Sequence, residues 1–479
     1  MFKDYFFGFV DGARENSNID ENFYNSQNID LKQKNLLILL GRKGTGKTYI
    51  AQKTVSDASK GDYNAYIITY EEIKEKMQLL KIVNPNLIHW KVILNIIILL
   101  RLFKNKDIKG SIPYVSDNSK NYLMHLFDSV KVGIGGIFEV NLKSTEKKSI
   151  EEIYQYLELI MDNLKLDKLN LFILDEFDDL LFTKEKRESL STLIGILNKY
   201  NIKNLKIVIL LRNDKIILSG ANQKILFDRL CSLKWSKSEL YCLVEKRLKT
   251  NNITLGDLFP KEIAVYNYER VDDQYTIKTE TLSFWDYIIE YTFYRPRDMV
   301  YFLNLCKKLY GDNKSLNRLE LRTVIDEYSK EYFYEFLSDE LTIYFQNNDM
   351  EKTKSIMYEL CEALCDPPIN KTKSETRYWK VMEGFNYDYF KKVVQERLSG
   401  VCKEDSEILE LFRHLLKIGC IGQLKIKSER PGEEGILRWA FSYQNETVIH
   451  SDIGRYILHK AIRYQFLPEA LPGGNMNGN

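Results

Sequence analysis

Apolar residues in the first half of the chain gather in short runs, and stretches of helical spacing separate these runs. The runs with the length and composition of buried strands span residues 36–40, 64–70, 171–174 and 205–211. Between the second and third runs, the segment from Ile88 to Phe103 has the length and apolar character of a largely buried helix. Strands that alternate with helices predict an α/β fold built on a parallel sheet.

The first of these runs leads into an octapeptide that fits the pattern G-x-x-x-x-G-K-[ST]. The octapeptide consists of Gly41, Arg42, Lys43, Gly44, Thr45, Gly46, Lys47 and Thr48. Its glycines let backbone N–H groups turn toward phosphates, and the following helix adds the positive end of its dipole. Lys47 is expected to reach the β- and γ-phosphates, and Thr48 is expected to bind Mg²⁺. The pattern therefore predicts a P-loop site for ATP or GTP.

The third run ends in the acidic pair Asp175 and Glu176. A carboxylate at the end of a buried strand is typical of a Walker B motif, so Asp175 is predicted to hold Mg²⁺. Glu176 is expected to polarise the attacking water, which favours hydrolysis over binding alone. Asp178 and Asp179 fit the acidic first turn of a helix better than a catalytic role. The segment also spells the helicase pattern D-E-x-D, but no downstream Q-x-x-G-R-x-G-R motif accompanies it.

Three polar clusters follow in a defined order. Asn213 comes just after the strand-like run at 205–211, and Arg229 lies in an Asp-Arg-Leu turn. Arg295 and Arg297 flank a proline that is suited to the first turn of a helix. Polar residues that follow parallel strands face the crevice where ligands bind, so Asn213 is expected near the nucleotide.

The order of these motifs resembles that of the initiator clade of AAA+ ATPases and of the related STAND signalling ATPases. The segments F-F-G near the start, G-R-K-G-T-G-K-T, I-L-D-E-F-D-D-L and R-P-R-D-M are similar to a bacterial P-loop ATPase family. The resemblance, which covers roughly residues 1–310, implies that Asn213 is the sensor-1 residue and Arg229 the arginine finger. It implies a sensor-2 role for Arg297, with Arg295 as the alternative. Guanidinium groups at such positions neutralise charge on the γ-phosphoryl oxygens.

The last third of the chain has a helix, strand, strand, helix pattern. Helical spacing runs from 403 to 418, strand-like runs cover 420–426 and 436–443, and Ser451 is a suitable N-cap for a second helix. This order predicts a winged-helix-like domain, such as AAA+ initiators and STAND proteins carry. Residues 401–470 contain ten Lys plus Arg and ten Asp plus Glu. Because this balance does not attract phosphate, DNA binding and protein contact both stay open for this domain.

His450 lies just before that second predicted helix. In STAND proteins a Met-His-Asp motif at the equivalent place contacts bound ADP, and I-H-S-D in this chain resembles it with Ser451 inserted. The resemblance implies that His450 contacts the nucleotide. The alternative is a histidine with a local structural role.

Composition excludes some classes of protein. The longest apolar run, Val92 to Leu100, is interrupted by Asn95 and is about half as long as a membrane span. The apolar stretch near Met1 is too short for a signal peptide. With a net charge of +2, any nucleic-acid surface must be local. Seven scattered cysteines without a C-x-x-C motif predict reduced thiols and a cytoplasmic protein.

The expected fold class is α/β, with a P-loop NTPase sheet of AAA+ type, a helical lid and a C-terminal helical or winged-helix region. The expected domains are an NTPase core at 1–235 with an insert at about 107–148, a helical lid at 236–330, a helical connector at 331–402, a winged-helix-like domain at 403–466 and a disordered tail at 467–479. Lys47 and Asp175 are 128 positions apart, which exceeds what a bare βαβαβ unit needs and indicates the insert.

These predictions converge on an ATP-binding and ATP-hydrolysing switch or motor of AAA+/STAND type in a bacterial cytoplasm. The family resemblance implies a role in defence against phage or mobile DNA. Two alternatives are a DNA-associated ATPase for replication, repair or transposition and a nucleotide-dependent scaffold without hydrolysis. The arginine finger implies self-association. No nuclease, protease or deaminase motif is visible in the sequence, so a separate effector or sensor protein is expected.

Overall fold

A computed structural model shows two compact units. The core unit comprises residues 28–42 and 47–233, and the C-terminal unit comprises residues 1–27, 43–46 and 234–479. The phosphate loop therefore contributes residues to both units. The structure describes residues 7, 24–25, 27–104, 150–162, 164–181, 184–200, 204–212, 227–271, 274–313, 315–333, 337, 341, 350–365, 384–398, 400, 402, 404–427, 436–444, 448, 450–451 and 454–466.

The core unit is built on a five-stranded sheet in the order β2-β3-β4-β1-β5, in which every pairing is parallel. The strands are β1 (Ile38–Gly41), β2 (Asn64–Thr69), β3 (Asn170–Asp175), β4 (Leu205–Leu211) and β5 (Leu230–Leu233). All side chains of β1, β3 and β4 are buried, as continuous apolar runs require in a sheet with both faces covered. Because the strands are parallel, Gly41, Asp175 and Leu211 end at the same edge of the sheet.

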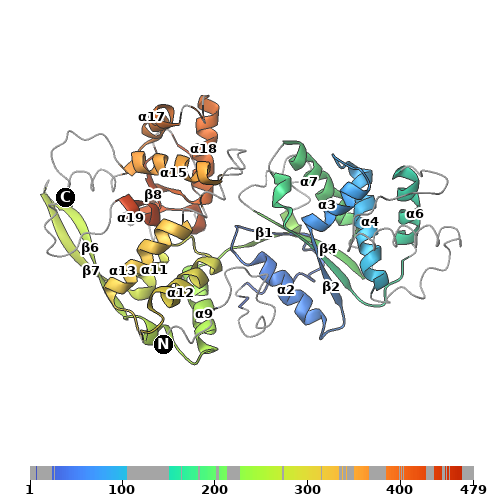
Figure 1. Cartoon of the computed structure of the whole chain (residues 1–479), viewed down its shortest axis with the longest axis horizontal. Helices are drawn as coiled ribbons and strands as arrows, with labels where there is room; N and C mark the ends of the chain where they lie inside the picture. Colours follow the sequence, from blue (N-terminus) through green and yellow to red (C-terminus); the bar gives the residue numbers. More distant parts are fainter. Residues whose placement is uncertain are drawn as a thin grey trace. The chain divides into compact units, whose positions relative to one another are not determined.

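Helices cover both faces of this sheet, with α2 on one side and α3, α4 and α7 on the other (Figure 1). The helical elements of the unit are α2 (Lys47–Ala58), α3 (Tyr70–Leu79), α4 (Leu87–Lys104), α6 (Ile150–Asp162), η4 (Phe177–Leu181), α7 (Lys184–Leu197), η5 (Asn198–Tyr200) and η6 (Phe227–Arg229). The expected buried helix is α4, whose side chains from Trp90 to Leu99 are all buried. One apolar cluster joins α3, α4, α6 and α7 to the sheet, so it fixes the strand ends that carry the site.

The C-terminal unit begins with a largely helical region. Its elements are α9 (Lys237–Lys249), α10 (Leu255–Leu258), β6 (Glu262–Val271), β7 (Gln274–Ser283), α11 (Phe284–Ile289), α12 (Pro296–Tyr310), α13 (Arg318–Glu327) and the π-helix η7 (Tyr328–Phe333). A capping box between Ser236 and Glu239 starts α9. Strands β6 and β7 form an antiparallel hairpin that the sequence analysis did not predict.

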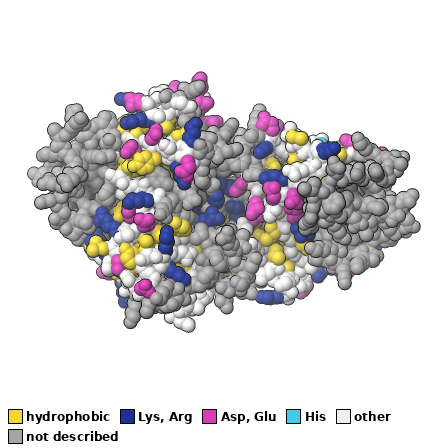
Figure 2. All heavy atoms as spheres, viewed as in Figure 1, with side chains coloured by type: hydrophobic (Ala, Val, Ile, Leu, Met, Phe, Trp, Pro, Cys, Tyr) yellow, Lys and Arg dark blue, Asp and Glu magenta, His cyan; other side chains and the backbone are white. Residues whose placement is uncertain are grey.

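The unit ends with helices and a small antiparallel sheet in the order β10-β8-β9. Its elements are α15 (Met350–Cys365), α17 (Tyr387–Arg397), α18 (Asp405–Ile418), β8 (Ile421–Lys427), β9 (Ile436–Ala440), η8 (Ser442–Gln444), β10 (Tyr456–Leu458) and α19 (Lys460–Phe466). We call the part from α18 to α19 the C-terminal module. On the face in Figure 2, basic and acidic side chains are interspersed over the described part of the C-terminal unit, in keeping with the balanced charge of the sequence.

The predicted helix starting at Ser451 is wrong. The chain instead forms strand β10, which pairs with β8, and the helix begins only at Lys460. Tyr456, Ile457 and Leu458 are all buried, so the segment buries more of its side chains as an edge strand beside β8 than it would as a helix with one exposed face. Ser451 donates its backbone N–H to the Tyr456 hydroxyl at 2.7 Å.

The structure confirms the expected fold class: a parallel P-loop sheet, a largely helical lid region, and a C-terminal region of helices with a small sheet. The expected insert at 107–148 and tail at 467–479 lie outside the described residues, and the domain boundaries stay predictions. None of the described helices combines the length and apolar character needed to cross a lipid bilayer.

Candidate nucleotide-binding site

The phosphate loop depends on the backbone freedom of two glycines. Gly44 and Gly46 have φ of +83° and +97°, in the region that residues with a Cβ rarely adopt. A Cβ on Gly46 would meet no atom within 4 Å, so space next to the loop is open there. A Cβ on Gly44 would lie 3.0 Å from Arg297 Cβ, which leaves no such room.

Lys47 opens helix α2 at the end of the loop. Its Nζ donates to the carbonyl oxygens of Gly41 at 2.8 Å and Arg42 at 3.3 Å. The first turn of α2 carries no acidic residue, so no carboxylate of that turn offsets the positive end of the helix dipole. The ammonium group and the helix N-terminus together form a cationic end to the loop, which suits an anionic ligand.

Thr48 and Asp175 come together although they are 127 residues apart. Thr48 Oγ1 donates to Asp175 Oδ2 at 2.7 Å, and the Glu176 backbone N–H donates to Asp175 Oδ1 at 2.9 Å. Asp175 is 5% exposed. Burial raises the pKa of this carboxyl group, while the two hydrogen bonds and the charge of Lys47 act in the opposite direction. The pair presents hydroxyl and carboxylate oxygens at one place, which are the ligands that Mg²⁺ prefers.

Glu176 follows β3 in a strained conformation, with φ of +65°. Its side chain is exposed, whereas Asp175 before it and Phe177 after it are buried. Phe177 packs against Tyr70 with ring centroids 5.3 Å apart. This packing holds the turn in which Glu176 faces outward.

The end of β4 lies between the ends of β1 and β3 in the sheet. Arg212, the first residue after β4, is 2% exposed, and the sequence analysis gave it no role. Its position as a cationic residue directly after a buried strand is the feature of the sequence that could have indicated it. Asn213, the predicted sensor-1 residue, lies outside the described residues. Arg229 ends η6, and its carbonyl oxygen accepts the Leu37 N–H at 2.8 Å beside the β1–β5 pairing.

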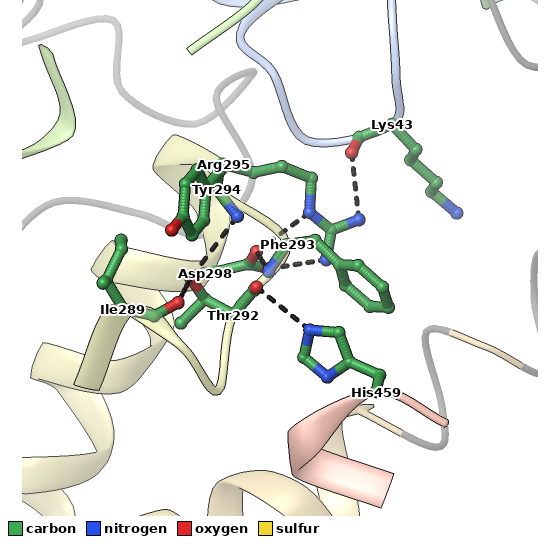
Figure 3. A network of polar contacts seen from close by, with 8 residues as sticks. All are labelled: Lys43, Ile289, Thr292, Phe293, Tyr294, Arg295, Asp298 and His459. Atoms are coloured by element: carbon green, nitrogen blue, oxygen red, sulfur yellow. Dashed lines mark hydrogen bonds and ion pairs between the residues drawn. The ribbon is translucent and has the colours of Figure 1, made fainter. Parts of the chain in front are cut away.

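Within the C-terminal unit, three groups hold residues 43–45 of the loop. Trp235 Nε1 donates to the Thr45 carbonyl at 2.9 Å, and Arg295 Nη1 donates to the Lys43 carbonyl at 3.2 Å (Figure 3). The Arg297 backbone N–H donates to the Gly44 carbonyl at 3.3 Å. The sequence analysis missed Trp235, because nothing local distinguishes it from a core tryptophan.

The two candidate sensor-2 arginines have different surroundings. Arg295 is 1% exposed, and its Nε and Nη2 donate to Asp298 at 3.0 and 2.5 Å. The side chain of Arg297 is only partly buried and runs beside Gly44, since a Cβ there would lie 3.2 Å from Arg297 Cδ. Arg295 is therefore committed to a buried ion pair and the loop backbone, whereas Arg297 lies along the loop itself.

His450 has aromatic neighbours within the C-terminal unit. Its ring packs edge-on against Tyr387 and Phe412, with centroid distances of 4.6 and 5.7 Å. Its predicted contact with the nucleotide stays a prediction. Another histidine, His459, has its Nε2 atom 3.2 Å from the carbonyl oxygen of Thr292, which precedes Arg295 by three residues.

The residues present fit Mg²⁺ and a nucleoside triphosphate. The loop has two glycines at positive φ and a lysine at the helix start, and Thr48 and Asp175 offer hard oxygen ligands. Among the described residues, no cluster of three or more His, Cys, Asp or Glu side chains has the arrangement of a metal site.

Comparison with known proteins gives one partial family match. Residues 238–337 match the model of the FunZ-associated C-terminal helical domain, so the match covers α9 to η7 and none of the parallel sheet. A search of curated proteins found no match to the chain.

Solved structures with a likeness to the chain include the following three. The Orc1 protein of Aeropyrum pernix, in complex with DNA, is 11% identical over 90% of this chain and 86% of that one, with a TM-score of 0.31. Cdc6p of Pyrobaculum aerophilum is 14% identical over 82% and 81%, with a TM-score of 0.30. AMPPCP-bound DnaA of Aquifex aeolicus is 12% identical over 84% and 99%, with a TM-score of 0.29. Likeness at this level assigns no activity to this chain.

Proposed function

We propose that this chain binds ATP with Mg²⁺ and hydrolyses it as a nucleotide-dependent switch. The observation that carries the proposal is the 2.7 Å contact between Thr48 of the phosphate loop and Asp175 at the end of β3. Two motifs that are distant in sequence meet there with the ligand chemistry that Mg²⁺·nucleotide binding requires.

Four residues of the core unit have roles in this proposal. Lys47 exchanges its contacts with the Gly41 and Arg42 carbonyls for the β- and γ-phosphate oxygens, which are better partners for an ammonium group. Thr48 and Asp175 hold Mg²⁺, which neutralises phosphate charge when it is bound. The exposed carboxylate of Glu176 orients a water molecule for attack on the γ-phosphorus and takes up its proton.

Arg297 is the stronger candidate for the sensor-2 role. It lies beside Gly44, and its guanidinium group can neutralise charge on phosphate oxygens at the loop. Asn213 is proposed to act near the attacking water, and Arg229 is proposed to act on the nucleotide of a neighbouring copy of the chain. These assignments derive from the resemblance to AAA+ and STAND ATPases.

The sequence resemblance also underlies the wider biological proposal, a switch that acts in bacterial defence against phage or mobile DNA. The competing role is a DNA-associated ATPase. The balanced charge of residues 401–470 supplies no electrostatic reason to prefer DNA. DNA-stimulated ATP turnover would select the competing role, whereas co-purification of an effector protein with a Glu176→Gln variant would select the switch.

The proposal of hydrolysis is tested with Glu176→Gln. The variant keeps the size of the side chain but cannot accept a proton, so ATP binding should persist while phosphate release falls by about 100-fold or more. Equilibrium ATP binding and steady-state phosphate release are measured on the same samples, with Glu185→Gln on α7 as the matched control. Unaltered turnover in Glu176→Gln would show that another group positions the water. ATP binding by the wild type without any turnover would select the scaffold.

A further inference from the structure

We infer that His459 couples the C-terminal module to the phosphate loop, as a positioning residue that acts through Thr292, Phe293 and Arg295. The inference rests on the proposed nucleotide site and adds a regulatory connection to it. All the contacts that carry it lie within the C-terminal unit.

The hydrogen bonds of His459 define its tautomer. The Ala461 backbone N–H donates to Nδ1 at 3.2 Å, so Nδ1 carries no proton. Nε2 therefore carries the proton and donates to the Thr292 carbonyl at 3.2 Å. His459 joins β10 to α19 in the chain, and its side chain is completely buried. A buried neutral imidazole with both nitrogens engaged is held in one orientation.

Ring contacts link His459 to Arg295 through Phe293. The rings of His459 and Phe293 lie 4.8 Å apart, and the Arg295 guanidinium carbon lies 4.8 Å from the centroid of the Phe293 ring (Figure 3). Phe293 is fixed by its backbone N–H, which donates to Asp298 Oδ2 at 2.9 Å. His459 thus contacts the same short segment that orients the arginine.

Arg295 transmits the position of this segment to the loop. Its ion pair with Asp298 is fully buried, and its remaining terminal nitrogen donates to the Lys43 carbonyl in the middle of the octapeptide. A planar guanidinium group held on two edges has little freedom to reorient. A shift of the Thr292–Asp298 segment would therefore change the conformation of the loop at Lys43.

The consequence is a reciprocal linkage between nucleotide binding and docking of the C-terminal module. If docking through His459 stabilises the loop conformation that binds phosphate, bound nucleotide must stabilise docking by the same free energy. A partner that displaces α19 would then lower the affinity for nucleotide. An effector or sensor can act on the site in this way.

The first test compares His459→Ala with His459→Gln. The alanine variant loses the donor to Thr292 and should raise the KM for ATP by about 5-fold or more, with a smaller change in kcat. Glutamine supplies an N–H that can replace the Nε2 donor, so His459→Gln should recover most of the affinity. Equal KM values for the wild type and both variants would overturn the inference.

A matched control separates this contact from general docking of α19. Tyr464→Phe removes one hydrogen bond from the same helix, in which Arg322 Nε donates to the tyrosine hydroxyl at 3.1 Å, and it keeps the ring that packs against Tyr291. Its KM for ATP should stay within about 2-fold of the wild type. A rise in KM as large as that of His459→Ala would reduce His459 to one of several docking contacts and overturn the specific role.

The reciprocal measurement needs no variant. Hydrogen exchange of wild-type α19 should slow when ATP is added, by more than that of α15, which serves as an internal reference. Equal protection of α15 and α19, or none in α19, overturns the inference while leaving nucleotide binding intact. If the wild type binds no nucleotide at all, the proposed function fails first and this inference fails with it.

Discussion

Crowding, rather than backbone conformation, distinguishes the two glycines at the centre of the phosphate loop. Both have positive φ, but only Gly44 is crowded, by Arg297. Gly46→Ala should cost about 1–2 kcal/mol of backbone strain and little else. Gly44→Ala should cost more, because the new methyl group must also displace Arg297. Thermal unfolding and calorimetric titration with ADP check both variants, and an equal loss of stability in the two would contradict the assigned crowding.

The role proposed for Asp175 requires a buried charge that opposes stability. Burial raises the pKa of its carboxyl group, so the charged form costs folding free energy at every pH above the pKa in the folded protein. Asp175→Asn should therefore leave the melting temperature unchanged or higher, because the amide oxygen can accept the Glu176 N–H while the amide NH2 donates to Thr48 Oγ1. ATP turnover should fall by about 100-fold or more, since a neutral ligand holds Mg²⁺ poorly. Melting curves and phosphate release test this, and turnover within about 3-fold of the wild type would refute the role.

Local sequence predicted the residues whose roles depend on motif and chain order, such as Lys47, Thr48 and Asp175. It did not predict which arginine clamps the loop. The commitment of Arg295 to Asp298 and the position of Arg297 beside Gly44 depend on packing in three dimensions. For the same reason, the sequence alone does not indicate a role for Trp235 or His459.

At the scale of elements, apolar patterning predicted strands that are buried on both faces and helices with one apolar face. It failed where a short apolar run formed a strand, at β10, and where segments of mixed polar and apolar residues formed a hairpin, at β6 and β7. The run Tyr456–Leu458 is too short for periodicity to distinguish a strand from a helix. Cross-strand pairing with β8, rather than local propensity, decides the outcome.

Strand β4 carries a buried cation that makes a pH-dependent contribution to stability. Lys206 is 4% exposed, its ammonium group donates to the Gln33 carbonyl, and burial lowers its pKa to about 8. Between pH 8 and the ordinary lysine pKa of about 10.4, the unfolded chain binds more protons than the folded one, so stability rises with pH. The slope is at most about 1.4 kcal/mol per pH unit.

Lys206→Met removes this titration and isolates its effect. The melting temperature of the wild type minus that of the variant should increase from pH 7.5 to pH 10, with both proteins measured in matched buffers. A difference that is constant across this range would show that Lys206 titrates as an exposed lysine does.

At the scale of the whole molecule, the predicted arginine finger requires a second copy of the chain. Arg229 is proposed to act on the nucleotide of a neighbour, so Arg229→Ala should bind ATP almost normally and turn it over slowly. Mixing Arg229→Ala with Lys47→Ala protein should restore part of the activity, because intact sites form between unlike subunits. Full turnover by a strictly monomeric protein would refute action in trans.

The fold class was predictable because it follows from motifs and periodicity that need no knowledge of packing, whereas the nucleotide chemistry inferred from the same motifs stays a prediction. The pathway was not predictable, since no effector motif is visible in the sequence. The connection from His459 to the loop was not predictable either, because 416 residues separate His459 from Lys43 and only the folded chain joins them.

The most direct measurement of the central claim is a calorimetric titration of the full-length protein with Mg²⁺·ATP, beside Lys47→Ala. The wild type should bind one nucleotide per chain with micromolar or tighter affinity. Lys47→Ala should show no saturable binding, because the ammonium group that meets the β- and γ-phosphates is gone. Equal binding isotherms for the two proteins, or no binding by a folded wild type, would contradict the account.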